Sequence, residues 1–140
     1  MAYYVDTCIY LNLWQKEESN SGLPFWKYAK DFFEKCEKEG KNFFYSGFVL
    51  KELNFVLGEK EFAGKRHLFS QPFFKKVIAY EEDYDKARRI ESESFFEVSF
   101  FDCMHVVLAN KSSSILVTRD RKLIELAEKY CTVARPEELL

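Results

Sequence analysis

The segment ILVTRD, residues 115–120, decides how the sequence folds. Ile115–Thr118 is a short apolar run of the kind that forms a strand buried on both faces of a parallel sheet. Asp120 follows at once and opens a helical pattern that continues to about Tyr130. The segment therefore predicts a buried strand that leads directly into a helix, with an acidic residue at the junction.

The same unit recurs in the first third of the chain. Ala2–Val5 is an apolar, aromatic run that stops at Asp6, and Thr7 can cap a following helix. Asn42–Tyr45 is again typical of a strand, and Ser46 opens a helical stretch with an apolar stripe. Strands and helices therefore alternate along the chain, which favours a parallel sheet.

The other expected elements continue this alternation. They are a helix with Pro24 at its first position and Gly40 at its end, a strand over Val77–Tyr80, a helix opened by the acidic stretch Glu81–Asp85, a helix from about Phe101 to Lys111, and a last strand over Cys131–Ala134. We therefore predict one α/β domain over residues 1–140. It has three α/β/α layers and a central parallel sheet of about five strands.

Composition limits the classes of function. The 140 residues suit one domain, and 47% hydrophobic residues can build a sizeable core. A net charge of -2 gives no overall attraction to nucleic acid, so an anionic substrate needs a bound cation or a basic patch. No stretch approaches the roughly 20 apolar residues of a membrane span, and no basic leader precedes the first strand. We expect a cytoplasmic protein without a membrane partner, whose scattered cysteines stay reduced, namely Cys8, Cys36, Cys103 and Cys131.

Four acids fall where ligands bind in parallel α/β sheets, beyond the carboxyl ends of the strands. Asp6 ends the first strand, Glu52 lies in the helix after the second, Asp102 starts a helix, and Asp120 follows the Ile115–Thr118 strand. Each alone is explained as a helix-terminal or solvated acid. Together they would repel one another unless they shared protons or a hard divalent cation, so we expect Mg²⁺ or Mn²⁺ among them.

Four segments resemble, in order and spacing, the motifs of the PIN-domain family: YYVDTCIYL (3–11), SGFVLKEL (46–53), FFDCMHVVLA (100–109) and ILVTRD (115–120). The resemblance extends from Tyr3 to about Ala134. It implies a five-stranded parallel sheet and a ribonuclease that depends on Mg²⁺ or Mn²⁺, many relatives being toxins of the VapC type. It also implies an RNA substrate, a small antitoxin protein as partner, and a homodimer.

The resemblance assigns roles by position. Asp6, Glu52, Asp102 and Asp120 correspond to the four acids that hold the metal, and Thr118 corresponds to the hydroxyl residue before the last acid. Ser46 matches the small hydroxyl residue before the second acid. One departure concerns Cys8, because many members have an asparagine there that helps to orient the first acid.

Two other classes of function compete with the nuclease. A catalytically weak PIN-like module that binds RNA or protein is favoured by Cys8. A phospho-receiver domain would need an aspartate at the end of a central strand and a lysine at the end of a later one. Val77–Tyr80 does not end in such an aspartate, and Cys131–Ala134 leads to Arg135 and Pro136, so this class is disfavoured.

Several further residues have two interpretations. We interpret His105 as a packing residue and Cys8 as a thiol without a catalytic role. The aromatic face of Phe25, Phe32 and Phe33 suits a core or a dimer surface. Arg119 suits a phosphate contact or a surface salt bridge about equally. Residues 59–76 form the least regular segment, and their excess of positive charge makes them a candidate for substrate selection.

Overall fold

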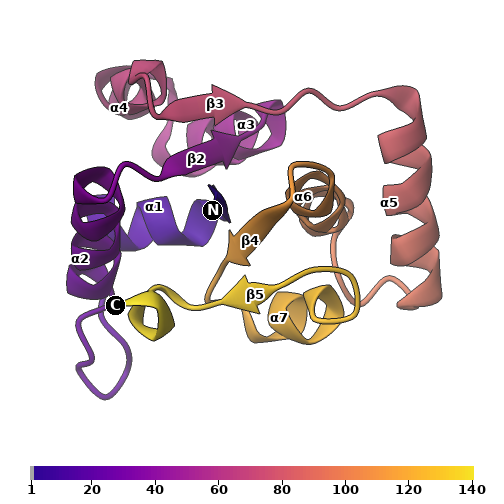
Figure 1. Ribbon diagram of the computed structural model, residues 1–140. Helices are drawn as coiled ribbons and strands as arrows, with labels where there is room; N and C mark the ends of the chain where they lie inside the picture. Colours follow the sequence, from indigo (N-terminus) through magenta and orange to yellow (C-terminus); the bar gives the residue numbers. More distant parts are fainter. Residues whose placement is uncertain (1) are drawn as a thin grey trace.

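Five parallel strands form the central sheet of the computed structural model, which describes residues 2–140. In sheet order they are β3, β2, β1, β4 and β5, from the top to the bottom of Figure 1. Their bounds are Ala2–Val5 for β1, Asn42–Tyr45 for β2, Phe74–Lys76 for β3, Ser114–Val117 for β4 and Val133–Ala134 for β5. The predicted five-stranded parallel sheet is confirmed.

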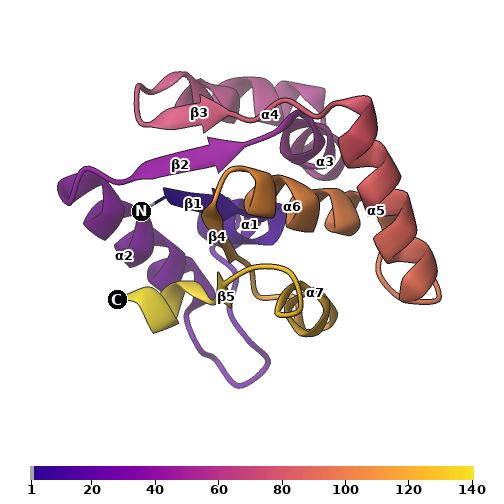
Figure 2. The same ribbon diagram turned by 45° about the vertical axis from the view of Figure 1, so that its right-hand side comes forward.

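The described residues also form seven α-helices and two 3-10 helices, all of which lie between strands except the last 3-10 helix, which follows β5. The α-helices are α1 (Thr7–Trp14), α2 (Phe25–Lys38), α3 (Gly47–Leu57), α4 (Glu59–Lys65), α5 (Glu81–Glu93), α6 (Phe100–Lys111) and α7 (Arg121–Ala127); the 3-10 helices are Arg66–Ser70 and Pro136–Leu139. Right-handed crossovers place α1–α4 on one face of the sheet and α5–α7 on the other, which gives the three predicted layers. Figure 2 shows α5 beside α6, which in turn packs on β1 and β4.

The strand β1 is the centre of the sheet and the point where the chain changes its direction of growth. It pairs with β2 on one side, Tyr4 beside Phe44, and with β4 on the other, Val5 beside Val117. The first strands extend the sheet from β1 toward β3, and the later strands extend it from β1 toward β5. The carboxyl ends of β1 and β4 therefore flank a topological switch point, which is where α/β sheets of this kind bind their ligands.

Aromatic rings fill the core between β1–β3 and the helices that cover them. The ring of Phe43 lies 5.2 Å from that of Phe33, 5.9 Å from that of Phe32 and 5.0 Å from that of Phe74, between centroids. Phe32 is completely buried and Phe33 partly so, which confirms the core interpretation for this pair. Phe25 does not belong to this cluster, because its ring lies under the guanidinium group of Arg119.

The third strand lies earlier in the chain than the sequence predicts. Val77–Tyr80 is not a strand; β3 is Phe74–Lys76. The reason is the length of β2, which is the only strand beside β3 within residues 2–140 and which ends at Tyr45, paired with Lys76. The backbone N–H of Val77 still donates to the carbonyl of Tyr45, at 2.8 Å, and the following residues have no strand beside them.

Helix ends also differ from expectation in places. Asp6, not Thr7, is the N-cap of α1, and Pro24 is the N-cap of α2 rather than its first residue. Residues 59–70 are not irregular, because α4 and a 3-10 helix occupy them. Gly58 makes the junction between α3 and α4 with a φ of 87°, a conformation that favours glycine.

The described part of the chain has no helix with the length and apolar character of a membrane span. The four cysteines are free thiols, of which Cys36 and Cys103 are buried.

Tyr10 gives the first testable prediction. Its side chain is completely buried, and within residues 2–140 its hydroxyl finds no hydrogen-bond partner. A buried hydroxyl without a partner destabilises the folded state, so Tyr10→Phe should raise the free energy of unfolding by about 1 kcal/mol. Urea unfolding followed by circular dichroism measures this change. A variant less stable than the parent would show that the hydroxyl has a partner in solution.

Candidate active site

The carboxylate of Asp6 lies at the switch point between β1 and β4. The backbone N–H of Asp6 donates to the carbonyl of Val117, at 2.9 Å, so the end of β1 is fixed to the end of β4. Its Oδ1 accepts a hydrogen bond from the backbone N–H of Thr7, at 2.8 Å. Its Oδ2 accepts from Thr118 Oγ1 at 2.7 Å and from Cys8 Sγ at 3.2 Å. The side chain is buried, and donors hold both of its oxygens in place.

Glu52 reaches the same place from the second turn of α3. Its Oε1 accepts a hydrogen bond from Thr7 Oγ1 at 2.9 Å and lies 2.5 Å from His105 Nε2. Burial acts to raise the pKa of Glu52, but the hydrogen bond and charge of His105 and the hydrogen bond from Thr7 outweigh burial and lower this pKa. Glu52 is therefore an ionised carboxylate with one oxygen occupied by donors.

A buried chain of hydrogen bonds continues from Glu52 into the protein. His105, on α6, is fully buried, and its Nδ1 lies 2.8 Å from the hydroxyl of Tyr4, on β1. That hydroxyl lies 2.6 Å from the Oγ of Ser46, the N-cap of α3. We call this arrangement the Ser46–Tyr4–His105 chain. Burial acts against the charged form of His105, but Glu52 and Asp6 outweigh burial and raise the pKa of His105.

Asp102 lies in the first turn of α6, where the Ser99 side chain caps the helix by accepting from the Asp102 backbone N–H. Burial raises the pKa of the Asp102 carboxyl to about 7, and the negative charges of Asp6, Glu52 and Asp120 raise it as well, against the smaller effect of His105. The electrostatic influence of three acids on Asp102 places them around one site. A raised pKa of this kind is the expected result when carboxylates gather without a counter-ion.

Asp120 is the most exposed of the four acids. It is the N-cap of α7, and its Oδ1 accepts from the backbone N–H groups of Lys122 and Leu123. Thr118 connects Asp120 with Asp6, because its Oγ1 donates to Asp6 Oδ2 and accepts from the Asp120 backbone N–H at 3.2 Å. Thr118 is therefore placed to hold the first acid rather than to face solvent.

Of the five residues predicted for the site, the structure brings Asp6 and Glu52 into the tightest group. Together with His105 they offer ligand atoms that all lie within 4.8 Å of one another. Asp102 and Asp120 lie outside this trio, and the charges of Asp6, Glu52 and Asp120 all act on Asp102. The interpretation of His105 as a packing residue accounts for its burial and misses its contact with Glu52. Its position three residues after Asp102 on one helix was the signal that could have found it.

Arg119 is not available for a phosphate contact, although the sequence left that role open. Its guanidinium group makes two hydrogen bonds of 2.8 Å to the carboxylate of Glu137 and donates to Asn12 Oδ1. It also stacks on the ring of Phe25, 3.9 Å from the ring centroid. The salt-bridge interpretation is therefore correct, and this arginine fastens the C-terminal 3-10 helix to the sheet.

Comparison with known proteins identifies the family of the chain. The family model of the PIN domain matches residues 3–129. The chain belongs to the PIN-domain family. No curated protein sequence matches it.

Solved structures of low sequence identity share its fold. VapBC2 from Rickettsia felis bound to a DNA fragment from its promoter superposes with a TM-score of 0.69 at 15% identity, over 96% of this chain and 98% of that one. FitAcB from Neisseria gonorrhoeae gives 0.66 at 16% identity, over 96% and 97%. The sarcin-ricin loop cleaving toxin VapC20 of Mycobacterium tuberculosis gives 0.66 at 18% identity, over 88% and 93%.

Cys8 performs in this PIN domain a part of the task expected of an asparagine. Its thiol donates to Asp6 Oδ2 and lies 3.7 Å from Thr118 Oγ1, so the first acid keeps a side-chain contact from position 8. Burial raises the pKa of the Cys8 thiol well above its usual value, and the charge of Asp6 raises it further. The thiol therefore stays protonated near neutral pH and is a poor nucleophile.

The donor set of this PIN domain fits a hard divalent cation. Such cations prefer carboxylate oxygens, and this site holds them from Asp6 and Glu52, with Asp102 and Asp120 beside them. Both hydrogen bonds to the Glu52 carboxylate use Oε1, which leaves Oε2 for a cation. The raised pKa of Asp102 is the second sign of fit, because a cation would relieve the repulsion that causes it.

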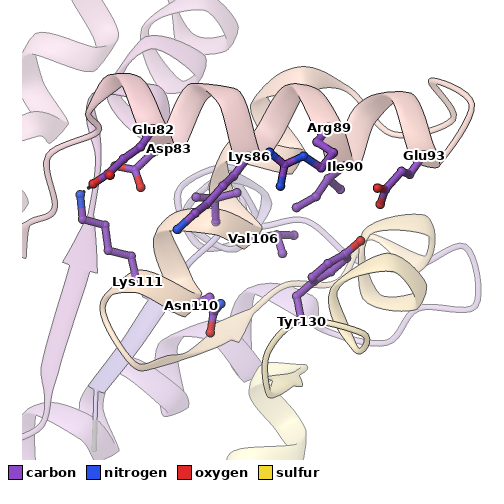
Figure 3. A pocket seen from close by; sticks show the side chains of 11 residues that line it. Glu82, Asp83, Lys86, Arg89, Ile90, Glu93, Val106, Asn110, Lys111 and Tyr130 are labelled. Carbon is purple, nitrogen blue, oxygen red and sulfur yellow. Dashed lines mark hydrogen bonds and ion pairs between the residues drawn. The ribbon is translucent and has the colours of Figure 1, made fainter.

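A hollow of about 480 Å³ lies elsewhere, between α5, the second half of α6 and the turn after α7 (Figure 3). Its lining mixes the charges of Glu82, Lys86, Arg89 and Glu93 around a floor that includes Ile90. None of the four acids of the site lines it. The hollow is therefore separate from the carboxylates and adds nothing to their chemistry.

Replacing Asp102 by asparagine should change how the stability of the metal-free protein depends on pH. The pKa of Asp102 is about 7 in the folded state against 3.8 for an ordinary aspartate, so folding favours the protonated form. This contribution to stability is complete below pH 4 and is lost as the pH rises through 7. The stability of Asp102→Asn relative to the parent should therefore rise by about 2 kcal/mol between pH 5 and pH 8, after allowance for partial exposure.

Urea unfolding of both proteins at pH 5, 6, 7 and 8, with a chelator present, tests this prediction. Asp85→Asn is the matched control, because Asp85 is an exposed acid on α5. Its stability relative to the parent should be the same at each pH. Parallel curves for Asp102→Asn and the parent would show that Asp102 is ionised throughout and that the acids do not interact.

Proposed function

We propose that this PIN domain is an endoribonuclease that requires Mg²⁺ or Mn²⁺ and acts as the toxin of a toxin–antitoxin pair. The observation that carries the proposal is that Asp6, directly after β1, meets Glu52 of α3 at the switch point of the sheet. The pKa of Asp102 is about 7 beside them, which is what an assembled cation site without its cation should have. Family membership supports a nuclease, and the named VapC and Fit structures support the toxin role.

In this proposal each residue of the site has a separate task. Asp6, Glu52, Asp102 and Asp120 hold the cation, and Thr118 fixes Asp6 through its hydroxyl group. A cation held by these acids would supply the chemistry of phosphodiester hydrolysis, namely an activated water molecule and neutralisation of the charge on the phosphate and the leaving group. The charge of the cation would also reduce the repulsion between RNA and a protein of net charge -2.

The binding-module alternative is not favoured by the structure of the site. It depended on Cys8 leaving Asp6 without the contact that orients it. The thiol makes that contact with Asp6 Oδ2, at 3.2 Å. Every carboxylate oxygen of Asp6 therefore has a donor, as a preorganised site requires.

The partners proposed for the chain are an antitoxin protein and a second copy of the chain. The VapBC2 structure contains the toxin–antitoxin pair on promoter DNA, and this chain covers 98% of the chain to which it is similar. Exposed aromatic side chains, among them Phe55, Phe95 and Phe96, supply apolar surface that a partner can cover. We also propose that the protein acts in the cytoplasm, where its RNA substrate would be.

Asp6→Asn tests the nuclease. Asparagine caps a helix about as well as aspartate does, so α1 should form and the variant should fold. It lacks the charge that a hard cation needs, so cleavage of single-stranded RNA in Mg²⁺ or Mn²⁺ should fall at least 100-fold. The rate of appearance of RNA fragments measures this, and Asp85→Asn should retain the parental rate.

Growth of a bacterial host tests the toxin role separately. Expression of the parent should arrest growth, and expression of Asp6→Asn at equal level should not. Full RNA cleavage by Asp6→Asn would refute the cation site. Normal growth with an active parental enzyme would instead refute the toxin role and leave the nuclease.

A further inference from the structure

We propose that His105, held by Tyr4 and Ser46, is the positioning residue that sets the Glu52 carboxylate for the cation. The inference rests on the proposed function, since it concerns the same site. It assigns His105 no contact with the substrate. Its task is to fix one oxygen of Glu52, so that the other oxygen keeps a constant place and direction.

Glu52 needs such a restraint because of where it is. It extends from α3 on a flexible side chain that is 28% exposed, and it must meet Asp6, which comes from a different element. Fixing a glutamate in one rotamer costs conformational entropy, and a side chain that was free beforehand would lose this entropy when it binds the ion. The hydrogen bond from His105 restricts the carboxylate before the cation arrives.

His105 can act as this restraint because it cannot move. Its side chain is completely buried, and its ring lies 5.5 Å from the ring of Tyr4, between centroids. The contact between Nδ1 and the Tyr4 hydroxyl fixes the rotation of the ring, and this aims Nε2 at Glu52. Ser46 holds the Tyr4 hydroxyl in turn, at 2.6 Å, from the start of the helix that carries Glu52.

His105 donates a hydrogen bond to Glu52 whether its imidazole is neutral or protonated. With a neutral imidazole, Ser46 donates to Tyr4, Tyr4 donates to Nδ1, and Nε2–H donates to Glu52. With an imidazolium, Nδ1–H donates to Tyr4 and Tyr4 donates to Ser46, while Nε2–H again donates to Glu52. The Ser46–Tyr4–His105 chain therefore presents a donor to Glu52 in both forms, which a positioning residue requires.

The geometry favours positioning over direct coordination by His105. Nε2 is 2.5 Å from Glu52 Oε1 and 3.9 Å from Asp6 Oδ1, so its proton is already committed to the glutamate. Coordination through Nε2 would remove that proton and bring two ligand atoms together without a donor between them. Residues that orient metal ligands in this way typically change metal affinity 10–100-fold when they are lost.

Tyr4→Phe is the variant that breaks the Ser46–Tyr4–His105 chain, and Tyr10→Phe is its matched control. Both tyrosines are completely buried, and both substitutions remove one hydroxyl from an intact ring. The Tyr4 hydroxyl has two partners, whereas that of Tyr10 has none within residues 2–140. Any effect of Tyr4→Phe that Tyr10→Phe lacks therefore comes from breaking the Ser46–Tyr4–His105 chain and not from loss of a core hydroxyl.

The first measurement needs neither metal nor substrate. NMR of the metal-free protein should show a downfield Nε2–H signal from His105, protected from exchange in the parent and in Tyr10→Phe. In Tyr4→Phe this signal should broaden or disappear. His67, the only other histidine, is exposed and should give the same signals in all three proteins. A protected His105 signal in Tyr4→Phe would overturn the proposal.

The second measurement is Mn²⁺ affinity by calorimetry, followed by RNA cleavage. Tyr4→Phe should bind Mn²⁺ about tenfold more weakly and lose kcat with little change in KM, while Tyr10→Phe stays within twofold. Equal or tighter Mn²⁺ binding by Tyr4→Phe would overturn the role, as would a parent that binds no Mn²⁺. A parent that binds Mn²⁺ but cleaves no RNA would refute the nuclease alone, because the affinity comparison still decides the role of His105.

A second pair of variants covers the case in which Tyr4→Phe does not fold. Ser46→Ala removes the hydroxyl at the far end of the Ser46–Tyr4–His105 chain, and Ser46→Thr keeps both a hydroxyl and a helix cap. Ser46→Ala should weaken Mn²⁺ binding and Ser46→Thr should restore it. Equal Mn²⁺ affinity in the folded Ser46→Ala and Ser46→Thr proteins would contradict the proposal.

Discussion

Repulsion between carboxylates at the carboxyl ends of β1 and β4 is the constraint on which the rest of the site depends. Asp6 is 5% exposed, so water does little to stabilise its charge. The protein compensates with donors from the backbone of Thr7 and the side chains of Thr118 and Cys8. Thr118 comes from the end of β4, so its hydroxyl reaches Asp6 only while β1 and β4 keep their register. A slip of one residue would reverse the facing of every side chain in β1, so the sheet and the site are fixed together.

Local signals made the junctions of the fold predictable from the sequence. Ser46 and Asp120 each stand between an apolar run and a helical pattern, and each is an N-cap in the structure, whereas the cap expected at Thr7 lies one residue earlier, at Asp6. Caps depend on residues only two or three positions away, which a sequence displays directly. The edge strand β3 was not predictable in this way. Its position depends on where β2 ends, and its exposed Lys75 and Lys76 conceal an edge strand as polar loop residues.

The acids of the site and Thr118 could be predicted, but the contacts of Tyr4 and His105 that hold Glu52 could not. Family resemblance located the four carboxylates by motif. Tyr4 stands in an apolar strand and His105 in a buried helix, where each is a plausible packing residue. Their partners are distant in the sequence, since the hydroxyl of Tyr4 contacts Ser46 and His105, which are 42 and 101 residues away. Only the folded sheet brings these residues together, so spacing along the chain carries no signal of the contacts that Tyr4 makes, although the i, i+3 spacing from Asp102 places His105 near the site.

Helix starts also explain how the acids coexist without a cation. The helices α1 and α6 begin at the site, with Asp6 as the cap of one and Asp102 in the first turn of the other. The partial positive charge at a helix N-terminus stabilises a nearby carboxylate. The raised pKa of Asp102 shows that this help is incomplete, because Asp102 remains protonated up to about neutral pH. Helix starts and the donor on His105 therefore offset only part of the repulsion within the acidic cluster, and a divalent cation would offset the rest.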